Sequence, residues 1–509
     1  MDGKLVVCDH GDPGAEIDNC ESEGACGNGR CLSPTCLEAE KDRTSFVGCL
    51  FYTGEVDNVA SDNALATSFL VSNPGDQPAV AVLQRLSTSG GWTPTGEVVV
   101  PQGKSARLSR PPEMRLDEAG PRIAGALRVW SNRPVTVEQI QSDDTDESAL
   151  SSGGTVLLPV HVLGTRHRVM TYKQVGSPAV VATANSAGGA GRLLIVGTQP
   201  GTRVTFKRSM YATGVVTGPS SLVAPGPEVF DLGDGDTFLA WTANEGDDLS
   251  GSEIESSLPV AVFSGNISTT YGKTAPGIHS PDMAHEQMPP VTAWSRKYVA
   301  AALPPQAGVC DTLLGTVGAP PGASIWRLLA DEDSTAVKFT GPEGVPPVHD
   351  DVTMAAGEVL EFVATGDFVV SASKVVLLTQ GIDCEPSLSV AISADKLLRD
   401  VTFAVLPMFD QMLAVVRPTN ELIPNLLTQS DPVLLDEMPI PDSLFRPAGS
   451  GYEVARVWLN PQCPPSERVC THRLQGRFGV TLRGMDILAS YATTLPAWCF
   501  DGPDPMCVQ

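Results

Sequence analysis

Hydrophobic and polar residues alternate along most of the chain in short runs that Gly- and Pro-rich turns separate. Alternation with a period of two places every second side chain on one face of a strand, so the pattern predicts half-buried β-strands. In residues 67–83, two such runs flank an Asn-Pro-Gly-Asp turn and predict a hairpin. The same design recurs at residues 180–196 and 313–329. Helix signals are few, namely one turn at residues 282–288 and a mixed insertion at 431–444.

One phrase of about ten residues occurs four times, and its copies align on Pro134, Pro259, Lys374 and Phe478, which lie 104 to 125 residues apart. The first three copies lead into a second shared phrase at residues 158–169, 288–299 and 390–401. A third recurring element, a strand with a central turn, lies at residues 97–104, 228–235 and 351–358. A repeat of this length indicates one structural unit that is used several times.

The repeat therefore predicts an all-β protein of tandem β-sandwich-like units. A β-propeller-like arrangement is the alternative, although blades of about 40–50 residues are shorter than this spacing. We expect five parts, which are a Cys-rich, disulfide-knotted segment at 1–43 and β units at 44–156, 157–287, 288–388 and 389–509, the last with C-terminal disulfides. Each unit is long enough to bury its own core.

The chain carries a formal net charge of −25. The phosphates of nucleic acid and the headgroups of an anionic membrane would repel such a surface, so both are excluded as electrostatic partners. No run of about 18 apolar residues is present, so we expect no transmembrane segment. The first residues are too short and too charged for an export signal, and we expect that such a signal has been removed.

The twelve cysteines fall into three groups with an even number in each. Even, local groups favour disulfides in an oxidising compartment, whereas paired C-x-x-C knuckles of a zinc site are absent. The expected disulfide cysteines are Cys8, Cys20, Cys26, Cys31, Cys36 and Cys49, then Cys310 and Cys384, then Cys463, Cys470, Cys499 and Cys507.

The order of these phrases resembles the N-terminal domain of the IgGFc-binding protein family, including its bacterial members, from about Val47 to Ala492. The residues that carry the resemblance are Phe69-Leu-Val-Ser-Asn-Pro, Arg133-Pro-Val-Thr-Val-Glu-Gln, Ser257-Leu-Pro-Val-Ala-Val-Phe-Ser-Gly-Asn and Glu286-Gln-Met-Pro-Pro-Val-Thr-Ala-Trp. The resemblance implies a non-enzymatic binding protein with protein or glycoprotein partners at a cell surface or in matrix. A shared fold does not carry a ligand, so immunoglobulin binding is not implied for this chain.

Four potential metal ligands lie within eight residues, namely His279, Asp282, His285 and Glu286. The two histidines are six residues apart, which is not the spacing of a helical zinc motif. A surface loop is the simpler interpretation, and we expect no metal. Asp143, Asp144 and Asp146 form a charge run that could gather calcium between strands, but such a run is more often a solvated loop.

Two further histidines, His161 and His167, are expected to be satisfied core or interface residues. No Gly-x-Ser-x-Gly elbow is present, and cysteine nucleophiles are disfavoured because all twelve cysteines can be paired. The sequence therefore does not predict an enzyme.

The leading hypothesis is a secreted or cell-surface binding and adhesion protein without a cofactor. Loops on rigid sheets carry recognition, so we expect contacts at residues 266–284 and 143–148. The expected binding residues are Asn266, Tyr271, His279, Asp282 and His285, with Asp143, Asp144 and Asp146. The alternatives are a self-assembling subunit of an extracellular fibre or coat, and a metal-dependent hydrolase that uses the four-residue cluster.

Overall fold

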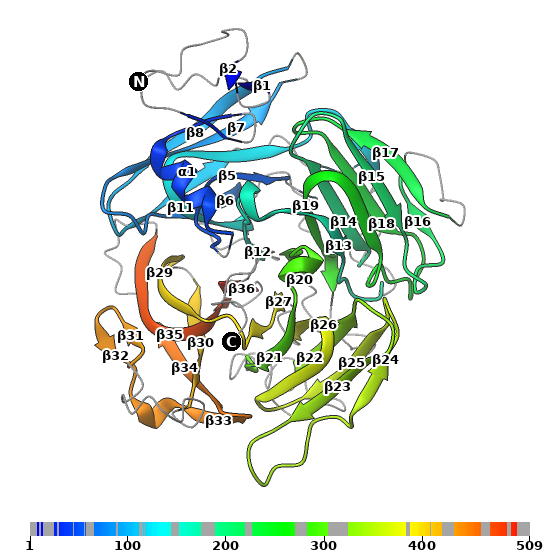
Figure 1. Cartoon of the computed structure of the whole chain (residues 1–509), viewed down its shortest axis with the longest axis vertical. Helices are drawn as coiled ribbons and strands as arrows, with labels where there is room; N and C mark the ends of the chain where they lie inside the picture. The colour runs from blue at the N-terminus through cyan, green and yellow to red at the C-terminus, as the bar shows by residue number, and fades with distance from the viewer. Residues whose placement is uncertain are drawn as a thin grey trace.

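The structure is a computed structural model, and four large β-sheets dominate it (Figure 1). Four short strands lie N-terminal to them, namely β1 (Cys8–Asp9), β2 (Asp12–Pro13), β3 (Ala25–Gly27) and β4 (Arg30–Leu32). Beyond these strands, the described residues are 33–43, 45–54, 56, 66–87, 90–110, 116, 118–143, 152–174, 189–218, 226–269, 282–303, 324–382, 387–407, 409–419, 432–459, 469–485 and 490–495.

Each copy of the repeated phrase lies in one long strand, and each of the four sheets is built around one of these strands. The first half of a long strand pairs with one set of strands and its second half with another. In the first sheet the register shifts between Trp130 and Val135, at the repeated phrase itself. The sheet curls there, and two layers face each other across a hydrophobic core. The all-β expectation with sandwich-like units is therefore confirmed.

The first two sheets contain seven and nine strands. The first consists of β5 (Gly48–Thr53), β6 (Ala66–Ser72), β7 (Ala79–Leu86), β8 (Trp92–Val100), β9 (Ser105–Arg110), the long β11 (Leu127–Asp143) and β12 (Gly153–Val156). The second consists of β10 (Gly120–Arg122), β13 (Gly164–Arg168), β14 (Gly191–Gly197), β15 (Thr202–Lys207), β16 (Val215–Val216), β17 (Glu228–Leu232), β18 (Thr237–Thr242), the long β19 (Glu253–Thr269) and β20 (Asp282–Gln287).

The third and fourth sheets contain eight strands each. The third consists of β21 (Ser295–Ala300), β22 (Ser324–Ala330), β23 (Thr335–Thr340), β24 (Val352–Met354), β25 (Val359–Ala364), the long β26 (Phe368–Ile382), β27 (Ser387–Val390) and β28 (Ile392–Ser393). The fourth consists of β29 (Leu398–Val405), β30 (Asp410–Pro418), β31 (Leu434–Leu435), β32 (Met438–Pro439), β33 (Arg446–Gly449), β34 (Tyr452–Leu459), the long β35 (Cys470–Met485) and β36 (Ser490–Leu495).

The predicted hairpin at residues 67–83 is wrong in its pairing, although both strands form. β6 pairs with the second half of β11 and with β9, whereas β7 pairs with the first half of β11 and with β8. The Asn-Pro-Gly-Asp turn thus connects the two layers instead of joining neighbouring strands. Local alternation predicts that strands form but does not determine which strands pair.

The four sheets surround a common centre, as Figure 1 shows. Each long strand is followed by a short strand that pairs with its second half, and these short strands are β12, β20, β27 and β36. β12 lies next to β20, β20 next to β27, β27 next to β36, and β36 next to β12. We call these four strands the hub. The hub closes the chain of sheets into a ring, in which the last sheet contacts the first.

The helical turn predicted at residues 282–288 is wrong, because residues 282–287 form strand β20 of the hub. The insertion at residues 431–444 contains β31, β32 and a short 3₁₀-helix, η4 (Asp442–Leu444). Two further 3₁₀-helices, η1 (Val160–Val162) and η2 (Val291–Ala293), lie in the second shared phrase and lead from the hub to the next sheet. Among the described residues, no helix is long and apolar enough to cross a membrane.

The third recurring element also has a place in the ring, because its turns pack against the preceding sheet. The Gly235 carbonyl accepts a hydrogen bond from the Ala126 amide. Gly235 has a φ of +79°, and a Cβ there would lie 2.8 Å from the Trp92 ring. Gly357 has a φ of +76°, and its carbonyl lies against Gly251 of the second sheet. A left-handed backbone and close approach at these positions both require glycine.

Candidate functional site

Asn266, the first residue of the predicted recognition loop, is fully buried within β19. Its side-chain oxygen accepts a hydrogen bond of 2.7 Å from the Tyr172 amide, and its amide nitrogen donates to the carbonyls of Tyr172 and Gly189. The exposed position expected for Asn266 is therefore wrong. The Asn266 side chain thus hydrogen-bonds the backbone of Tyr172, which lies in no strand, as the backbone of a neighbouring strand would.

The predicted residues on β20 are buried in the hub as well. Asp282 accepts hydrogen bonds of 2.7 Å from the amides of Ser152 and Met283. Glu286 accepts one of 3.2 Å from the Thr155 hydroxyl, and burial raises the pKa of Glu286 well above its ordinary value. Both carboxyl groups thus connect β20 with the first sheet, and the exposed position expected for Asp282 and Glu286 is wrong.

His285 is stacked on Phe263, with ring centres 5.5 Å apart and planes only 2° from parallel. Its Nε2 lies 3.1 Å from the Gln141 side-chain nitrogen, which donates to it when Nε2 is unprotonated. Burial, assisted by the charge of Arg192, lowers the pKa of His285 to about 3. This histidine is therefore a neutral packing residue at physiological pH.

The geometry of β20 does not bring its three potential metal ligands, Asp282, His285 and Glu286, together. Side chains alternate between the faces of a strand, so Asp282 and Glu286 share one face while His285 lies on the other. Within the part of the chain that the structure describes, no three His, Cys, Asp or Glu side chains form a cluster that could hold a metal ion. His279 and Tyr271 lie outside the described residues, as do Asp144 and Asp146. Asp143 is the last residue of β11.

The core positions expected for the other two histidines are confirmed, but the expected hydrogen bonds of His167 are not found. Burial lowers the pKa of His161 to about 4 and that of His167 to about 3. Both ring nitrogens of His167 lack a hydrogen-bond partner among the described residues. Such an unpaired group costs stability. Because the folded pKa values of both histidines are lowered, stability should also fall as pH falls below about 6.5.

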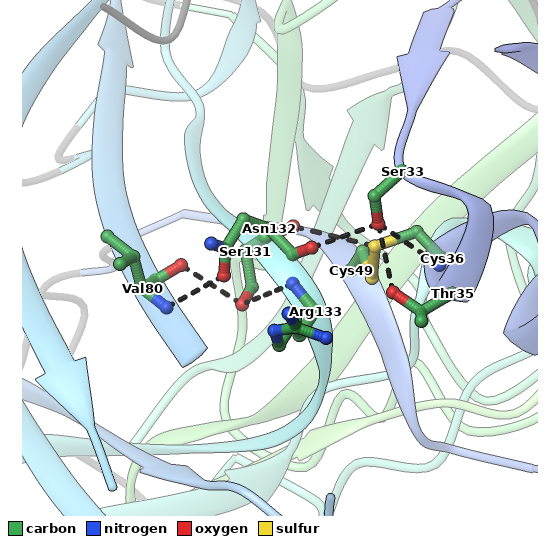
Figure 2. Close-up of a disulfide and its surroundings, with 8 residues drawn as sticks. All are labelled: Ser33, Thr35, Cys36, Cys49, Val80, Ser131, Asn132 and Arg133. Carbon is green, nitrogen blue, oxygen red and sulfur yellow. Dashed lines mark hydrogen bonds between the residues drawn. A yellow bond between two sulfur atoms is a disulfide. The ribbon is translucent and has the colours of Figure 1, made fainter. Parts of the chain in front are cut away.

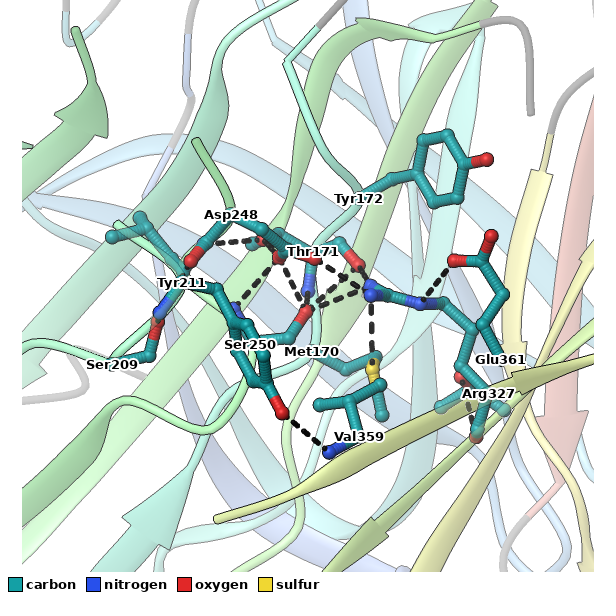
Figure 3. Close-up of polar contacts among 12 residues, drawn as sticks. Met170, Thr171, Tyr172, Ser209, Tyr211, Asp248, Ser250, Arg327, Val359 and Glu361 are labelled. Atoms are coloured by element: carbon teal, nitrogen blue, oxygen red, sulfur yellow. Dashed lines mark hydrogen bonds and ion pairs between the residues drawn. The ribbon is translucent and has the colours of Figure 1, made fainter. Parts of the chain in front are cut away.

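The contact between the second and third sheets contains a buried polar network around Arg327 (Figure 3). Arg327 of β22 lies 2.6 Å from the Asp248 carboxylate, 2.8 Å from the Ser250 hydroxyl and 3.1 Å from Glu361. It also donates to the Thr171 carbonyl. Burial raises the pKa of Asp248, but the Arg327 charge and the hydrogen bonds from Ser250 outweigh it, so the pKa is lowered.

A second ion-pair group joins the same two sheets. Asp331, in the turn after β22, accepts hydrogen bonds of 2.7 to 2.9 Å from Arg166 and Arg168 of β13. Neither the group around Arg327 nor the group around Asp331 was predicted from the sequence. The available signal was a charged residue inside an apolar strand, since Arg327 stands between Trp326 and Leu328.

The N-terminal segment is fastened to the first sheet by a disulfide between Cys36 and Cys49 (Figure 2). Cys36 lies on helix α1 (Pro34–Lys41), and Ser33 caps this helix by accepting a hydrogen bond from the Cys36 amide. The Ser33 hydroxyl in turn donates to the Asn132 carbonyl of β11 at 2.9 Å. Cys470 is disulfide-bonded too. The disulfide expectation is confirmed for these three cysteines, and most of the remaining cysteines lie outside the described residues.

Replacement of both Cys36 and Cys49 by serine should release α1 from the first sheet. Closing a loop of this length in the unfolded chain corresponds to about 3 kcal/mol of stability. We expect rapid proteolysis between residues 33 and 49 and a lower urea midpoint, with the digestion pattern of residues 66–495 unchanged. If this segment stays as resistant as in the oxidised protein, the hydrogen bonds of Ser33 hold α1 without the disulfide.

The comparisons with known proteins give one family. The family model of the IgGFc binding protein matches residues 153–484, which is more than half of the chain. The match runs from β12 to the end of the long strand β35, a narrower range than the one expected from Val47 onward. No curated protein matches the chain significantly. The chain therefore belongs to the IgGFc-binding protein family.

Proposed function

We propose that this protein is an extracellular, non-enzymatic binding protein whose partners are other proteins or glycoproteins. The observation that carries the proposal is the family match, which covers most of three of the four sheets. The family is one of binding proteins, and its name refers to the Fc part of immunoglobulin G. The disulfide-bonded cysteines support an oxidising, extracellular location.

The structure also supports a rigid scaffold rather than a catalytic centre. The residues expected to bind or catalyse on β19 and β20 are buried, and their polar atoms hold neighbouring segments of the ring. The surface available to a partner is therefore formed by the turns and outer strands of the sheets. Such loops on rigid sheets are where proteins usually bind their partners.

The proposal is tested by immobilising the oxidised chain on a biosensor. The probes are the Fc fragment of immunoglobulin G, the same fragment after deglycosylation, and fractionated extracellular proteins from the protein's native surroundings. We expect saturable binding of at least one of these, with loss of binding after the chain is unfolded and reduced. Binding by the unfolded chain alone, or by neither form, would contradict the proposal.

A further inference from the structure

A pocket of about 260 Å³ lies beside the disulfide-held helix, on the first sheet. It is lined by residues 73–77, which form the turn between β6 and β7, by Arg133 and Pro134 of β11, and by Thr35 of α1. The pocket lies at the point where the register of β11 shifts. Its volume lies just below the range of about 300–1,000 Å³ that is usual for ligand sites, so it fits one side chain better than a large ligand.

The walls of this pocket are held in place before any partner arrives. The Asn73 side chain is fully buried and donates to the carbonyls of Gln77, Val100 and Pro101. Its oxygen accepts a hydrogen bond of 3.0 Å from the Gly75 amide. The opposite wall is fixed by the disulfide of α1. A preformed pocket loses little conformational entropy when a partner binds.

The pocket contains a basic side chain, Arg133, in a protein that is acidic overall. The chain has 59 acidic and 34 basic residues, yet the half-buried Arg133 forms no ion pair within the described residues. In the third sheet, Ser373 occupies the position of Arg133, and the adjacent Lys374 lies 3.2 Å from Glu332 and donates to the Asp333 carbonyl. The basic residue of the third-sheet phrase is thus paired with its own turn, whereas Arg133 forms no ion pair within the described residues and can bind a ligand.

We propose that this pocket is an anchor site for a single acidic side chain, Asp or Glu, of a protein partner, with Arg133 as its counter-ion. A guanidinium group binds a carboxylate through two parallel hydrogen bonds, which fixes orientation as well as affinity. The rings of Pro74 and Pro134 provide apolar walls for the stem of the side chain. Asp76 also lines the pocket, and its charge opposes a carboxylate ligand, so the contact with Arg133 has to outweigh this repulsion. The inference rests on the proposed protein-binding function and adds the site and the chemistry of the partner.

The direct test uses saturation-transfer NMR with two capped peptides, Ac-Gly-Glu-Gly-NH₂ and Ac-Gly-Gln-Gly-NH₂, in separate samples. We expect transfer to the Glu side-chain protons only, and we expect it to weaken as the salt concentration rises. The R133Q variant should abolish the transfer, while R399Q, which removes an exposed arginine elsewhere, should leave it unchanged. Equal transfer to both peptides, or none to either, would overturn the proposal.

The second readout separates this inference from the proposed function. For any partner that the biosensor identifies, R133Q should weaken binding at least about tenfold, as expected when a charge-assisted contact is removed. R133K keeps the charge but not the two-pronged geometry and should fall between R133Q and the wild type. Unchanged melting of R133Q shows that the fold is intact. If a partner binds wild type and R133Q equally, the pocket is not the anchor and the binding function stands. If no partner binds either protein, the proposed function itself fails.

Discussion

Replacing Arg327 with methionine should lower the free energy of unfolding by about 3–5 kcal/mol, because it leaves a buried carboxylate without its partner. Both side chains of the pair are only 7% exposed. Asp248 would keep its hydrogen bonds from Thr171 and Ser250 but would lose the charge that lowers its pKa. Urea unfolding followed by tryptophan fluorescence measures the loss, since the buried Trp326 is the neighbouring residue.

The same unfolding experiment on three variants separates the interaction energy of Arg327 with Asp248 from the contacts that each residue makes with other neighbours. The D248N variant should also be strongly destabilised, whereas the R327M/D248N double variant should lose clearly less than the sum of the two single losses. The matched control is R203Q, which breaks an exposed Arg–Asp pair of 3.7 Å in the second sheet and should change stability by less than about 1 kcal/mol. Additive losses in the double variant would show that the two residues stabilise the ring independently.

The strands could be predicted because apolar and polar residues alternate along them, and the repeat could be predicted because its phrase recurs in the sequence. The four copies of the phrase around Pro134, Pro259, Lys374 and Phe478 do coincide with the four long strands. The phrase is repeated because each unit needs one strand that bends from one layer into the other. The division into parts at residues 43, 156, 287 and 388 remains a prediction.

The pairing of strands and the position of the candidate site could not be predicted in this way. Whether residues 67–83 form a hairpin or cross between layers depends on β11, which lies more than 40 residues further along the chain. Similarly, a stretch such as residues 282–287, with Asp, His, Glu and Gln among six residues, has the composition of an exposed loop. It is buried because the other three hub strands surround it and supply hydrogen-bond partners such as Thr155. Partners that are distant in sequence decide both outcomes.

The contact that closes the ring leads to the second large effect, which is a loss of stability as pH rises from about 4.5 to about 7. Glu138 of β11 is buried where the first sheet meets the fourth, and it accepts hydrogen bonds from the Ala404 amide and the Thr493 hydroxyl. Burial outweighs these two hydrogen bonds and raises the pKa of Glu138 to about 7. The neighbouring strands β6 and β12 carry no ionisable side chain, and Arg399 and Asp400 of β29 are exposed at its far end.

The direction of this pH dependence follows from the protonation of Glu138 in the folded and the unfolded chain. Below pH 4.5 the carboxyl group is protonated whether the chain is folded or unfolded, so Glu138 does not make stability depend on pH. Between about pH 4.5 and 7 the unfolded chain releases the proton while the folded chain retains it, and stability falls by about 3 kcal/mol in total. Above pH 7 the loss is complete and stays constant. The buried histidines act in the opposite direction, below about pH 6.5, because their pKa values are lowered.

The E138Q variant isolates this contribution, because glutamine keeps the oxygen acceptor and removes the ionisation. The difference in unfolding free energy between E138Q and wild type should grow in favour of E138Q from pH 5 to pH 8, by up to about 3 kcal/mol. The histidine contributions cancel in this difference. E97Q, which changes an exposed carboxylate on β8, serves as the matched control and should give a nearly flat difference. Amide hydrogen exchange of wild type at pH 8 against pH 6, corrected for the intrinsic rate, should show faster opening in β12, β29 and β36 than in β22 and β26. A flat E138Q difference would mean that water reaches Glu138 in the folded ring and that ionisation there does not weaken the contact between the first and last sheets.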